Sequence, residues 1–342
     1  MSACGHRRSL GVLRLLLPAL FVLLAASGSM ASSRSHLYRE LNLALQYSVD
    51  RQQILASPLP PSTSVGLEFI HSRPPLPRGQ SGLQGVDLHL RLSDPPGSGL
   101  ADLYFGDAWA LFGVGRQRSQ LRIGHFNIPF GMNPVMEPRG IFRMPLEALD
   151  LGYKKDWGIS WQRESGEHDL EVGGFLASGG DLHWRRGSFL FAGRLGTPTY
   201  RDFEYGFSLL IADSPPTMGD VRMADMMVRR VRAGLDAIYL YGTHTILKSE
   251  LAAGTDDGRS VAGLMAAVDW IPPNSTRWVV ALQSEALRRN SPGDAMDMVR
   301  ITAEASYSLG DLTMLRLDLV RVLESSMGTS TELYFMVHHY GR

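Results

Sequence analysis

From Leu41 to Val49 every second residue is apolar, and the same period of two recurs along most of the chain. This period describes a strand with one apolar face and one polar face. Several polar positions are charged, and because such charges are costly in an apolar interior, we expect them to line a water-filled space. For the first strand, the pattern assigns Leu41, Leu43, Leu45, Tyr47 and Val49 to the apolar face and Glu40, Asn42 and Gln46 to the polar one.

The N-terminus is typical of an export signal. A basic start with Arg7 and Arg8 precedes an apolar run over 10–26, and small residues follow up to Ala31. We therefore expect residues 1–31 to be a cleaved signal peptide and 32–342 the mature chain, with a retained N-terminal helix as the alternative. Removal of the signal changes the formal net charge from +0 to about −3 and removes the single cysteine, Cys4.

Alternating segments that follow an export signal indicate an all-β fold, a transmembrane antiparallel β-barrel of the outer membrane. Past the signal, no apolar stretch reaches the ~18 residues of a membrane-spanning helix. The alternation predicts about 16 strands, within a range of 14–18. They are expected at 38–50, 62–73, 83–93, 100–113, 118–128, 154–164, 167–177, 186–196, 202–213, 230–242, 244–255, 259–271, 276–289, 296–309, 311–323 and 330–340. Together these strands form one domain over residues 32–342.

The connections between these strands differ in length. With a periplasmic N-terminus, the turns at 164–166, 242–243, 272–275 and 308–311 are periplasmic, and the longer connections at 51–61, 129–153, 213–229 and 289–296 are external loops. Under this topology many aromatic residues fall near the periplasmic ends, as expected for a girdle at the lipid–water boundary. They are Tyr38, Trp161, Tyr200, Phe203, Tyr205, Tyr239, Tyr241, Trp270, Trp278, Tyr307 and Tyr340.

One run resembles a known family. The segment 121–131, of sequence L-R-I-G-H-F-N-I-P-F-G, is similar to a strand and loop start of Gram-negative outer-membrane porins of the phosphate- and polyphosphate-selective group, as is 155–159, K-D-W-G-I. The resemblance extends over residues 100–212. It implies a passive diffusion channel, often a homotrimer, of 16 strands, in which the third external loop folds into the lumen. The chain differs from this family in having only Lys154 and Lys155 as lysines near that loop, and in ending on Arg342 rather than on an aromatic residue.

In this chain the loop would span 129–153. Charges of both signs in a narrow passage create a transverse field that discriminates between solutes. The expected constriction residues are Glu137, Arg139, Arg143, Glu147, Asp150, Lys154 and Lys155. Cations expected on the lumen wall are Arg91, Arg122, Arg232, Lys248, Arg300 and Arg316, and expected acidic residues are Asp87, Asp169, Glu171, Asp236, Glu250, Glu304 and Asp318. Pairing across strands, which would stabilise the wall, is the alternative role for these charges.

These features predict a porin-like channel for passive diffusion of small hydrophilic solutes or ions. A structural or ligand-binding outer-membrane barrel without an open channel is the alternative, and a soluble β-protein is a further one. No compact Ser/His constellation suggests an enzyme, so no catalytic residue is proposed. His338 and His339 point to opposite faces of a strand, so no metal site is expected, and neither is a cofactor. The expected partners are the lipid bilayer and the solutes, and nothing suggests nucleic-acid binding.

Overall fold

The computed structural model describes residues 34–55, 63–74, 80–93, 102–114, 119–136, 143, 145–146, 154–180, 187–199, 201–215, 217–218, 221–222, 227–291, 294–324 and 328–342. The expected signal peptide, 1–31, lies outside these residues. Within the described ranges, no helix is long and apolar enough to cross a membrane.

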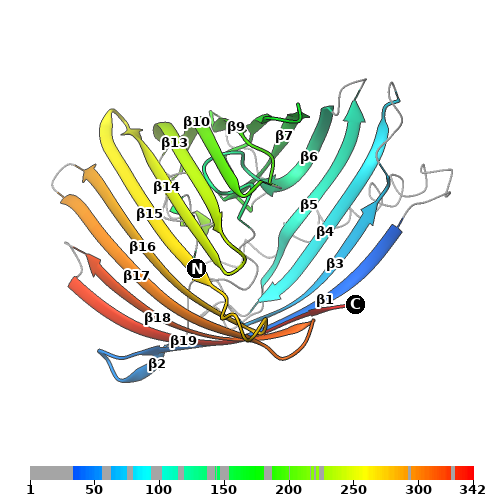
Figure 1. Cartoon of the computed structure of the whole chain (residues 1–342). Coiled ribbons are helices and arrows are strands. Elements are labelled where there is room, and N and C mark those ends of the chain that lie inside the picture. Colours follow the sequence, from blue (N-terminus) through cyan, green and yellow to red (C-terminus); the bar gives the residue numbers. More distant parts are fainter. Residues whose placement is uncertain are drawn as a thin grey trace, which may run out of the picture.

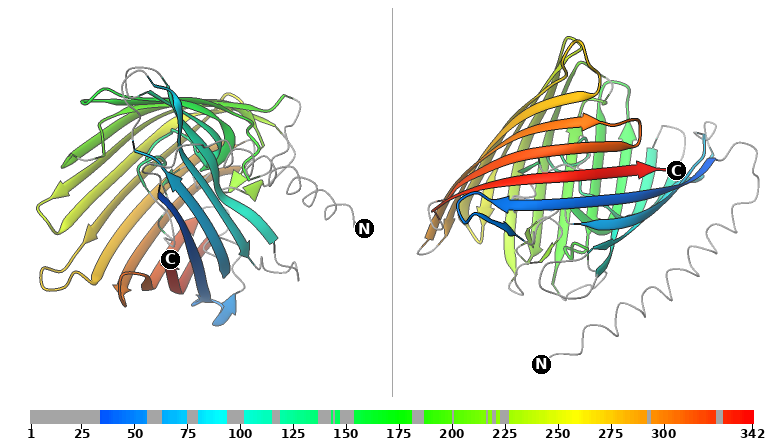
Figure 2. Two further views of the ribbon diagram at one scale, coloured as in Figure 1. Left: turned by 90° about the vertical axis from the view of Figure 1, so that its right-hand side faces the viewer. Right: turned by 90° about the horizontal axis from the view of Figure 1, so that it is seen from below.

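Sixteen long strands pair in a closed ring (Figures 1 and 2). Each strand pairs antiparallel with its neighbours, and β1 also pairs with β19, which closes the sheet. The strands of the first half are β1 (Arg34–Ser48), β3 (Ser64–Ser72), β4 (Gly82–Ser93), β5 (Asp102–Val114), β6 (Ser119–Asn127), β7 (Lys155–Glu164), β8 (Asp169–Phe175) and β9 (Phe189–Gly196). Those of the second half are β10 (Phe203–Ser214), β13 (Val228–Tyr241), β14 (Thr245–Asp256), β15 (Arg259–Trp270), β16 (Trp278–Ser291), β17 (Asp294–Ser308), β18 (Thr313–Glu324) and β19 (Gly328–Gly341).

Three short strands lie outside this ring of long strands. β2 (Gln53–Leu55) folds back on the end of β1, and β11 (Thr217–Met218) pairs with β12 (Val221–Arg222) in a separate small hairpin. The sequence pattern did not predict them, because runs of two or three residues are too short to show a period.

All sixteen predicted strand ranges overlap the observed long strands, and the predicted antiparallel barrel is confirmed. The predicted long connection at 289–296 is wrong. β16 continues to Ser291 and β17 begins at Asp294, and these two residues are still paired in register. Asn290 supports the extension through a side-chain hydrogen bond of 2.5 Å to Ser260 on β15. The two strands therefore remain paired up to Ser291 and Asp294, and most of the predicted connection belongs to strands.

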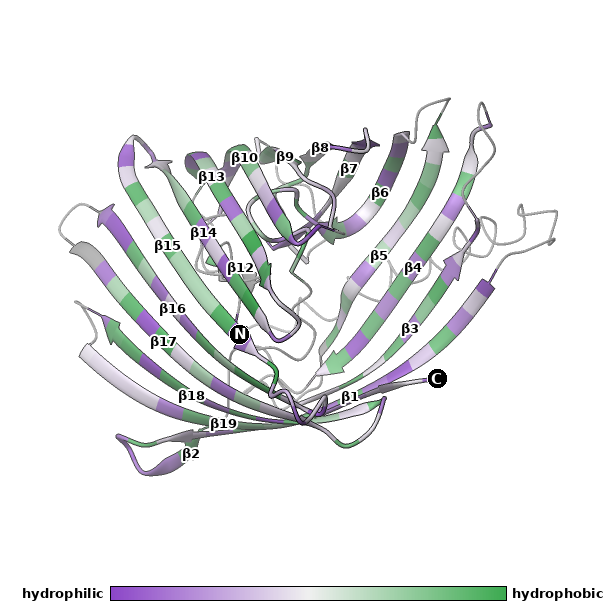
Figure 3. Cartoon of the chain, viewed as in Figure 1, coloured by the Kyte–Doolittle hydropathy of each residue, from purple (hydrophilic) through white to green (hydrophobic). Residues whose placement is uncertain are grey.

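Hydrophilic and hydrophobic residues alternate along many of the strands (Figure 3), and their burial assigns them to the two faces of the sheet as predicted. On β1, Leu43 is 46% exposed and Leu45 48%, whereas Glu40, Asn42 and Gln46 are buried on the inner face. β10 shows the same pattern over its whole length, with exposed and buried residues alternating from Phe203 to Ile211. The outer face is thus an apolar belt, and the inner face carries the charges.

Aromatic side chains collect on the outer face at the end of the ring that carries the short turns. Phe203 contacts Tyr239, and Trp278 contacts Tyr307, with ring centroids 6.1 and 4.8 Å apart. Tyr205, Tyr241 and Trp270 are exposed beside them. This placement agrees with the predicted girdle for β10, for β13 and for β15 to β17; Tyr200 lies outside the described residues.

Two of the predicted girdle residues point inward instead. Tyr38 and Tyr340 stack on each other with centroids 4.9 Å apart, and the Tyr340 hydroxyl donates a hydrogen bond to buried Glu68. Both share the inner face with Glu40, which pairs with Tyr340 across the strands. Proximity to a strand end says nothing about the face, which the period of two determines.

The lipid-facing assignment can be tested at Leu209, in the middle of β10 and 53% exposed. We expect Leu209→Arg to lower the free energy of unfolding in lipid vesicles by about 2–4 kcal/mol, because it places a charge in the apolar belt. Gln162→Arg, on the inner face of β7, is the matched control and should change stability much less. Urea unfolding followed by tryptophan fluorescence measures both, and equal effects would contradict the assignment.

Candidate functional site

The described part of the connection between β6 and β7 packs against the inner wall. Ile128, Phe130, Met132 and Leu146 are fully buried in this connection. They form one apolar cluster with wall residues of β8 to β10 and β14 to β16, namely Phe175, Leu190, Ala192, Leu210, Ala212, Ala252, Val261, Met265, Ala267 and Leu287. Each large side chain buried in this way contributes about 1.5–3 kcal/mol, so the described part of the connection is held firmly against one side of the barrel.

The run Pro129-Phe130-Gly131 can lie close to the wall because a glycine takes part in each of two contacts. The Phe130 ring lies against Gly234 on β13, where an added Cβ would be 3.2 Å from it. Gly131 has a φ of +56°, and a Cβ at this position would collide with the Glu250 side chain. Glycine alone adopts this conformation without strain and leaves room for the carboxylate.

Glu250 on β14 binds the connection at two places, at Met132 and at Leu146. Its carboxylate accepts hydrogen bonds from the backbone N–H of Met132, at 3.1 Å, and of Leu146, at 2.9 Å. Beside it, Ser208 on β10 accepts a hydrogen bond of 3.0 Å from the Gly131 N–H. Because Glu250 is buried, its carboxyl group needs these amide donors, and the amides in turn need a buried acceptor.

Arg143 makes a second anchor. Its Nε donates to Glu304 on β17 at 2.8 Å, its Nη1 pairs with Asp269 on β15, and only 4% of its side chain is exposed. Burial alone would lower the pKa of Arg143, but the carboxylates of Glu304 and Asp269 outweigh it and raise that pKa above its ordinary value. Lys248 pairs with Asp269 at 2.7 Å and Arg316 with Glu304 at 3.1 Å, so the cluster alternates cations and anions.

The other predicted constriction residues are placed as follows. Lys155 is the first residue of β7 and is buried, with Nζ 2.6 Å from Asp107 and 2.8 Å from the Gly106 carbonyl. Lys154 precedes it, and its carbonyl accepts a hydrogen bond from Asn133. Glu137, Arg139, Glu147 and Asp150 lie outside the described residues.

The predicted lumen-wall cations lie on the inner face, and most are paired. Arg91 binds buried Glu40 through Nη2 and Nε at 2.6 and 2.7 Å, and His89 lies 2.6 Å from the same carboxylate. Arg300 makes a two-pronged pair with Glu285, and Lys248 and Arg316 belong to the Arg143 cluster. Arg122 differs, because its nearest carboxylate, Glu171, is 3.8 Å away.

The sequence reasoning missed two residues of this network, Asp269 and Glu285. Asp269 follows the inward series of β15 that includes Met265 and Ala267. Because these inward residues are apolar, the two faces of β15 do not differ in hydropathy, and the alternation gave no reason to single out Asp269. Glu285 lies two residues after Gln283, on the same polar face of β16, and could have been found from that spacing.

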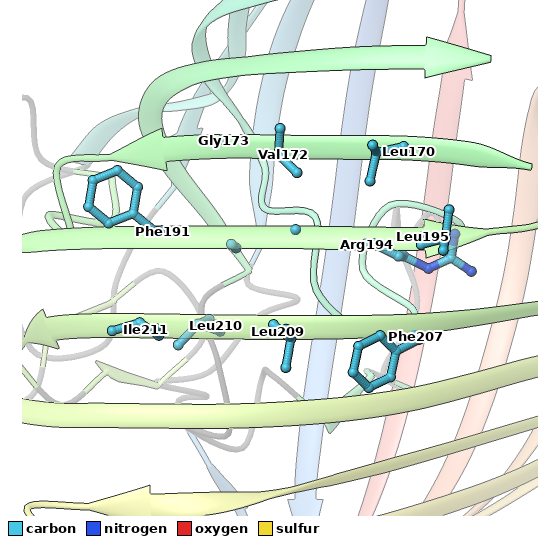
Figure 4. Close-up of a pocket in the computed structure, with 12 residues that line it drawn as sticks. Leu170, Val172, Gly173, Phe191, Arg194, Leu195, Phe207, Leu209, Leu210 and Ile211 are labelled. Carbon is cyan, nitrogen blue, oxygen red and sulfur yellow. The ribbon is translucent and has the colours of Figure 1, made fainter. Parts of the chain in front are cut away.

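A shallow groove crosses the outer face at β8 to β10 (Figure 4). Its walls are apolar side chains, including Val172, Phe191, Leu195 and Leu209, and at Gly193 an added Cβ would lie only 3.0 Å from Val172. Because these residues belong to the lipid-facing belt, the groove is part of the outer surface and not of the lumen. Among the described residues, no group of three or more His, Cys, Asp or Glu side chains could hold a metal ion.

A closed ring of sixteen antiparallel strands, apolar outside and charged inside, is the fold of outer-membrane porins. Similar solved structures include the anion-selective porin of Comamonas acidovorans, with 12% identity over 90% of this chain and 100% of that one and a TM-score of 0.64. The outer membrane channel DcaP of Acinetobacter baumannii has 10% identity over 91% and 98% and a TM-score of 0.62. OmpT, an outer membrane protein of Vibrio cholerae in a trimer form, has 9% identity over 90% and 99% and a TM-score of 0.62.

No family model matches the chain, and no curated protein is similar to it. At these identities the solved structures establish the fold alone, and the phosphate-selective subgroup suggested by the run at 121–131 is not confirmed.

The Glu250 anchor can be tested by Glu250→Ala. The substitution leaves the amides of Met132 and Leu146 without their buried acceptor, which should cost about 1–3 kcal/mol of unfolding free energy. It should also make the connection between β6 and β7 more sensitive to added protease. Glu167→Ala, at an exposed position between β7 and β8, is the control and should change neither property. An unchanged protease sensitivity in Glu250→Ala would contradict the anchoring role.

Proposed function

We propose that this chain forms an outer-membrane channel for passive diffusion of small hydrophilic solutes or ions, and that the connection between β6 and β7 narrows its lumen. The observation that carries the proposal is the pair of anchors at Glu250 and Arg143. They attach the described part of the connection to the inner faces of β14, β15 and β17. A segment held inside a closed barrel reduces the free cross-section and places charges beside the path of a solute.

Further support comes from the two faces of the wall and from the structures that share the fold. The exposed apolar belt suits a bilayer, and the inner charges suit an aqueous path. Two of the similar structures are described as a porin and as an outer membrane channel, and one occurs in a trimer form. We infer an exported, non-enzymatic protein of the outer membrane that assembles as a homotrimer.

A second candidate function is a structural or ligand-binding barrel without an open channel. The observation in its favour is the burial of many inner-wall groups. Glu68, Glu285 and Asp318, for example, are almost fully covered although they face inward. If this packing continued across the barrel, no solute would pass. Conductance of the purified protein in planar bilayers separates the two functions, because only a channel gives ion currents.

The role of the anchored connection is tested by Arg143→Ala. Without this guanidinium, the carboxylates of Glu304 and Asp269 each lose one ion-pair partner. The loss of these two ion pairs should release the connection from β15 and β17. We expect a higher single-channel conductance and an altered ion selectivity, measured as a shift of the reversal potential in a salt gradient.

Arg229→Ala is the matched control. Arg229 also forms a two-pronged ion pair, with Asp213, but it is 69% exposed and lies on the outer face of β13. This substitution should leave conductance and selectivity unchanged. If Arg143→Ala behaved like Arg229→Ala, the connection would not form the constriction.

A further inference from the structure

Arg122 on β6 has an unusual environment for an arginine of the inner wall. Its guanidinium carbon lies 5.3 Å from the ring centroid of Trp109 on β5 and 5.2 Å from that of Phe126 on β6. Its side chain is 24% exposed. Residue 122 alternates with outward-facing Ile123, so the exposed part faces the lumen.

The guanidinium of Arg122 makes no hydrogen bond in the part of the chain that the structure describes, and its Nε is buried without a partner. Its closest charge is the Glu171 carboxylate, 3.8 Å from Nη1, which already accepts a hydrogen bond of 2.6 Å from Ser160. Arg91 and Arg194, in contrast, each donate two hydrogen bonds to one carboxylate. The two Nη groups of Arg122, which are not buried in this way, thus keep donors available for a molecule in the lumen.

We propose that Arg122 is a binding subsite on the channel wall for the carboxylate of a monoanionic organic solute; this inference rests on the proposed function. Two aromatic rings lie beside the guanidinium and favour its positive charge, and the N–H groups of its two Nη atoms match the two oxygens of a carboxylate. Trp109, with Leu111 as the cross-strand neighbour of Arg122, offers apolar contacts for the rest of the solute, whereas Phe126 is buried and only supports the guanidinium from below.

The same surroundings favour a monoanion over phosphate. Glu171 places a negative charge within 4 Å of the guanidinium, and it repels a dianion more strongly than a carboxylate. The aromatic rings also offer nothing to the hydrated oxygens of phosphate. The subsite therefore selects for one charge and an apolar body.

Sodium benzoate is the probe. In planar bilayers it should reduce the KCl current through the native channel in a concentration-dependent way. Arg122→Gln should raise the half-blocking concentration about tenfold, since the charged fork is lost. Glu171→Gln should lower it about threefold, because a repelling charge is removed. Arg229→Gln, on the outer face, should behave like the native protein.

Saturation-transfer NMR of benzoate with the barrel in detergent measures binding whether or not the barrel conducts. Variants are compared only if they show the heat-modifiable gel migration of the folded protein. Arg122→Lys, which keeps the charge but loses the planar fork, should bind with intermediate strength and guards against misfolding of Arg122→Gln.

The outcomes are distinguishable. Binding and block that are equal in the native protein and in Arg122→Gln would overturn the inference while leaving the channel intact. An Arg122-dependent block by inorganic phosphate at lower concentration than benzoate would overturn the assignment to carboxylates. Absence of current in every variant, with binding that still depends on Arg122, would overturn the proposed function and support the subsite.

Discussion

The pairing of β1 with β19 is the constraint on which the rest of the structure depends. Ten residue pairs, from Arg39 with Gly341 to Ser48 with Glu332, join the two ends of the chain in one ladder. A closed ladder satisfies the backbone of every long strand and leaves no open edge, which is the condition for a sheet to lie in lipid. Closure also encloses an interior space. Every second side chain of the sixteen strands points into this space and must fit there.

The inward-facing side chains are accommodated in two different ways. On β8 to β10 and β14 to β16, apolar side chains pack beneath the connection that follows β6. On β1, β4 and β14 to β18, arginines and a lysine pair with carboxylates, as in Arg91 with Glu40, Lys248 with Asp269 and Arg300 with Glu285. Arg143 joins the two regions, because it belongs to the connection and binds the charged wall. The charged side chains of the wall therefore also hold the described part of the connection in place.

Much of this fold was predictable because the period of two is a local property. The alternation located all sixteen long strands and assigned the faces of Glu40, Asn42 and Gln46 correctly. The same alternation places Tyr38 on the inner face, two residues from Glu40. The prediction of a girdle instead gave more weight to its position near a strand end. The connection predicted at 289–296 was too long because turn-forming residues do not reveal how far the pairing of two strands continues.

The candidate site was less predictable because its contacts are not local. Arg143 and Glu250 were both identified as inward charges, yet nothing in the sequence joins Arg143 to Asp269 or Glu304, which are 126 and 161 residues away. The acceptor role of Glu250 toward two amides, separated from it by 118 and 104 residues, was equally invisible. Such partners follow from strand order and register, which only the closed barrel provides.

The central claim is that the connection between β6 and β7 is held inside the barrel. It is tested most directly by the reactivity of a single thiol in the Cys4→Ser background, with Met132→Cys compared with Thr243→Cys in an exposed short turn. The account predicts that a membrane-impermeant thiol reagent modifies position 132 far more slowly than position 243, and that Arg143→Ala speeds the reaction at 132. Equal rates at the two positions in the otherwise native barrel would contradict it.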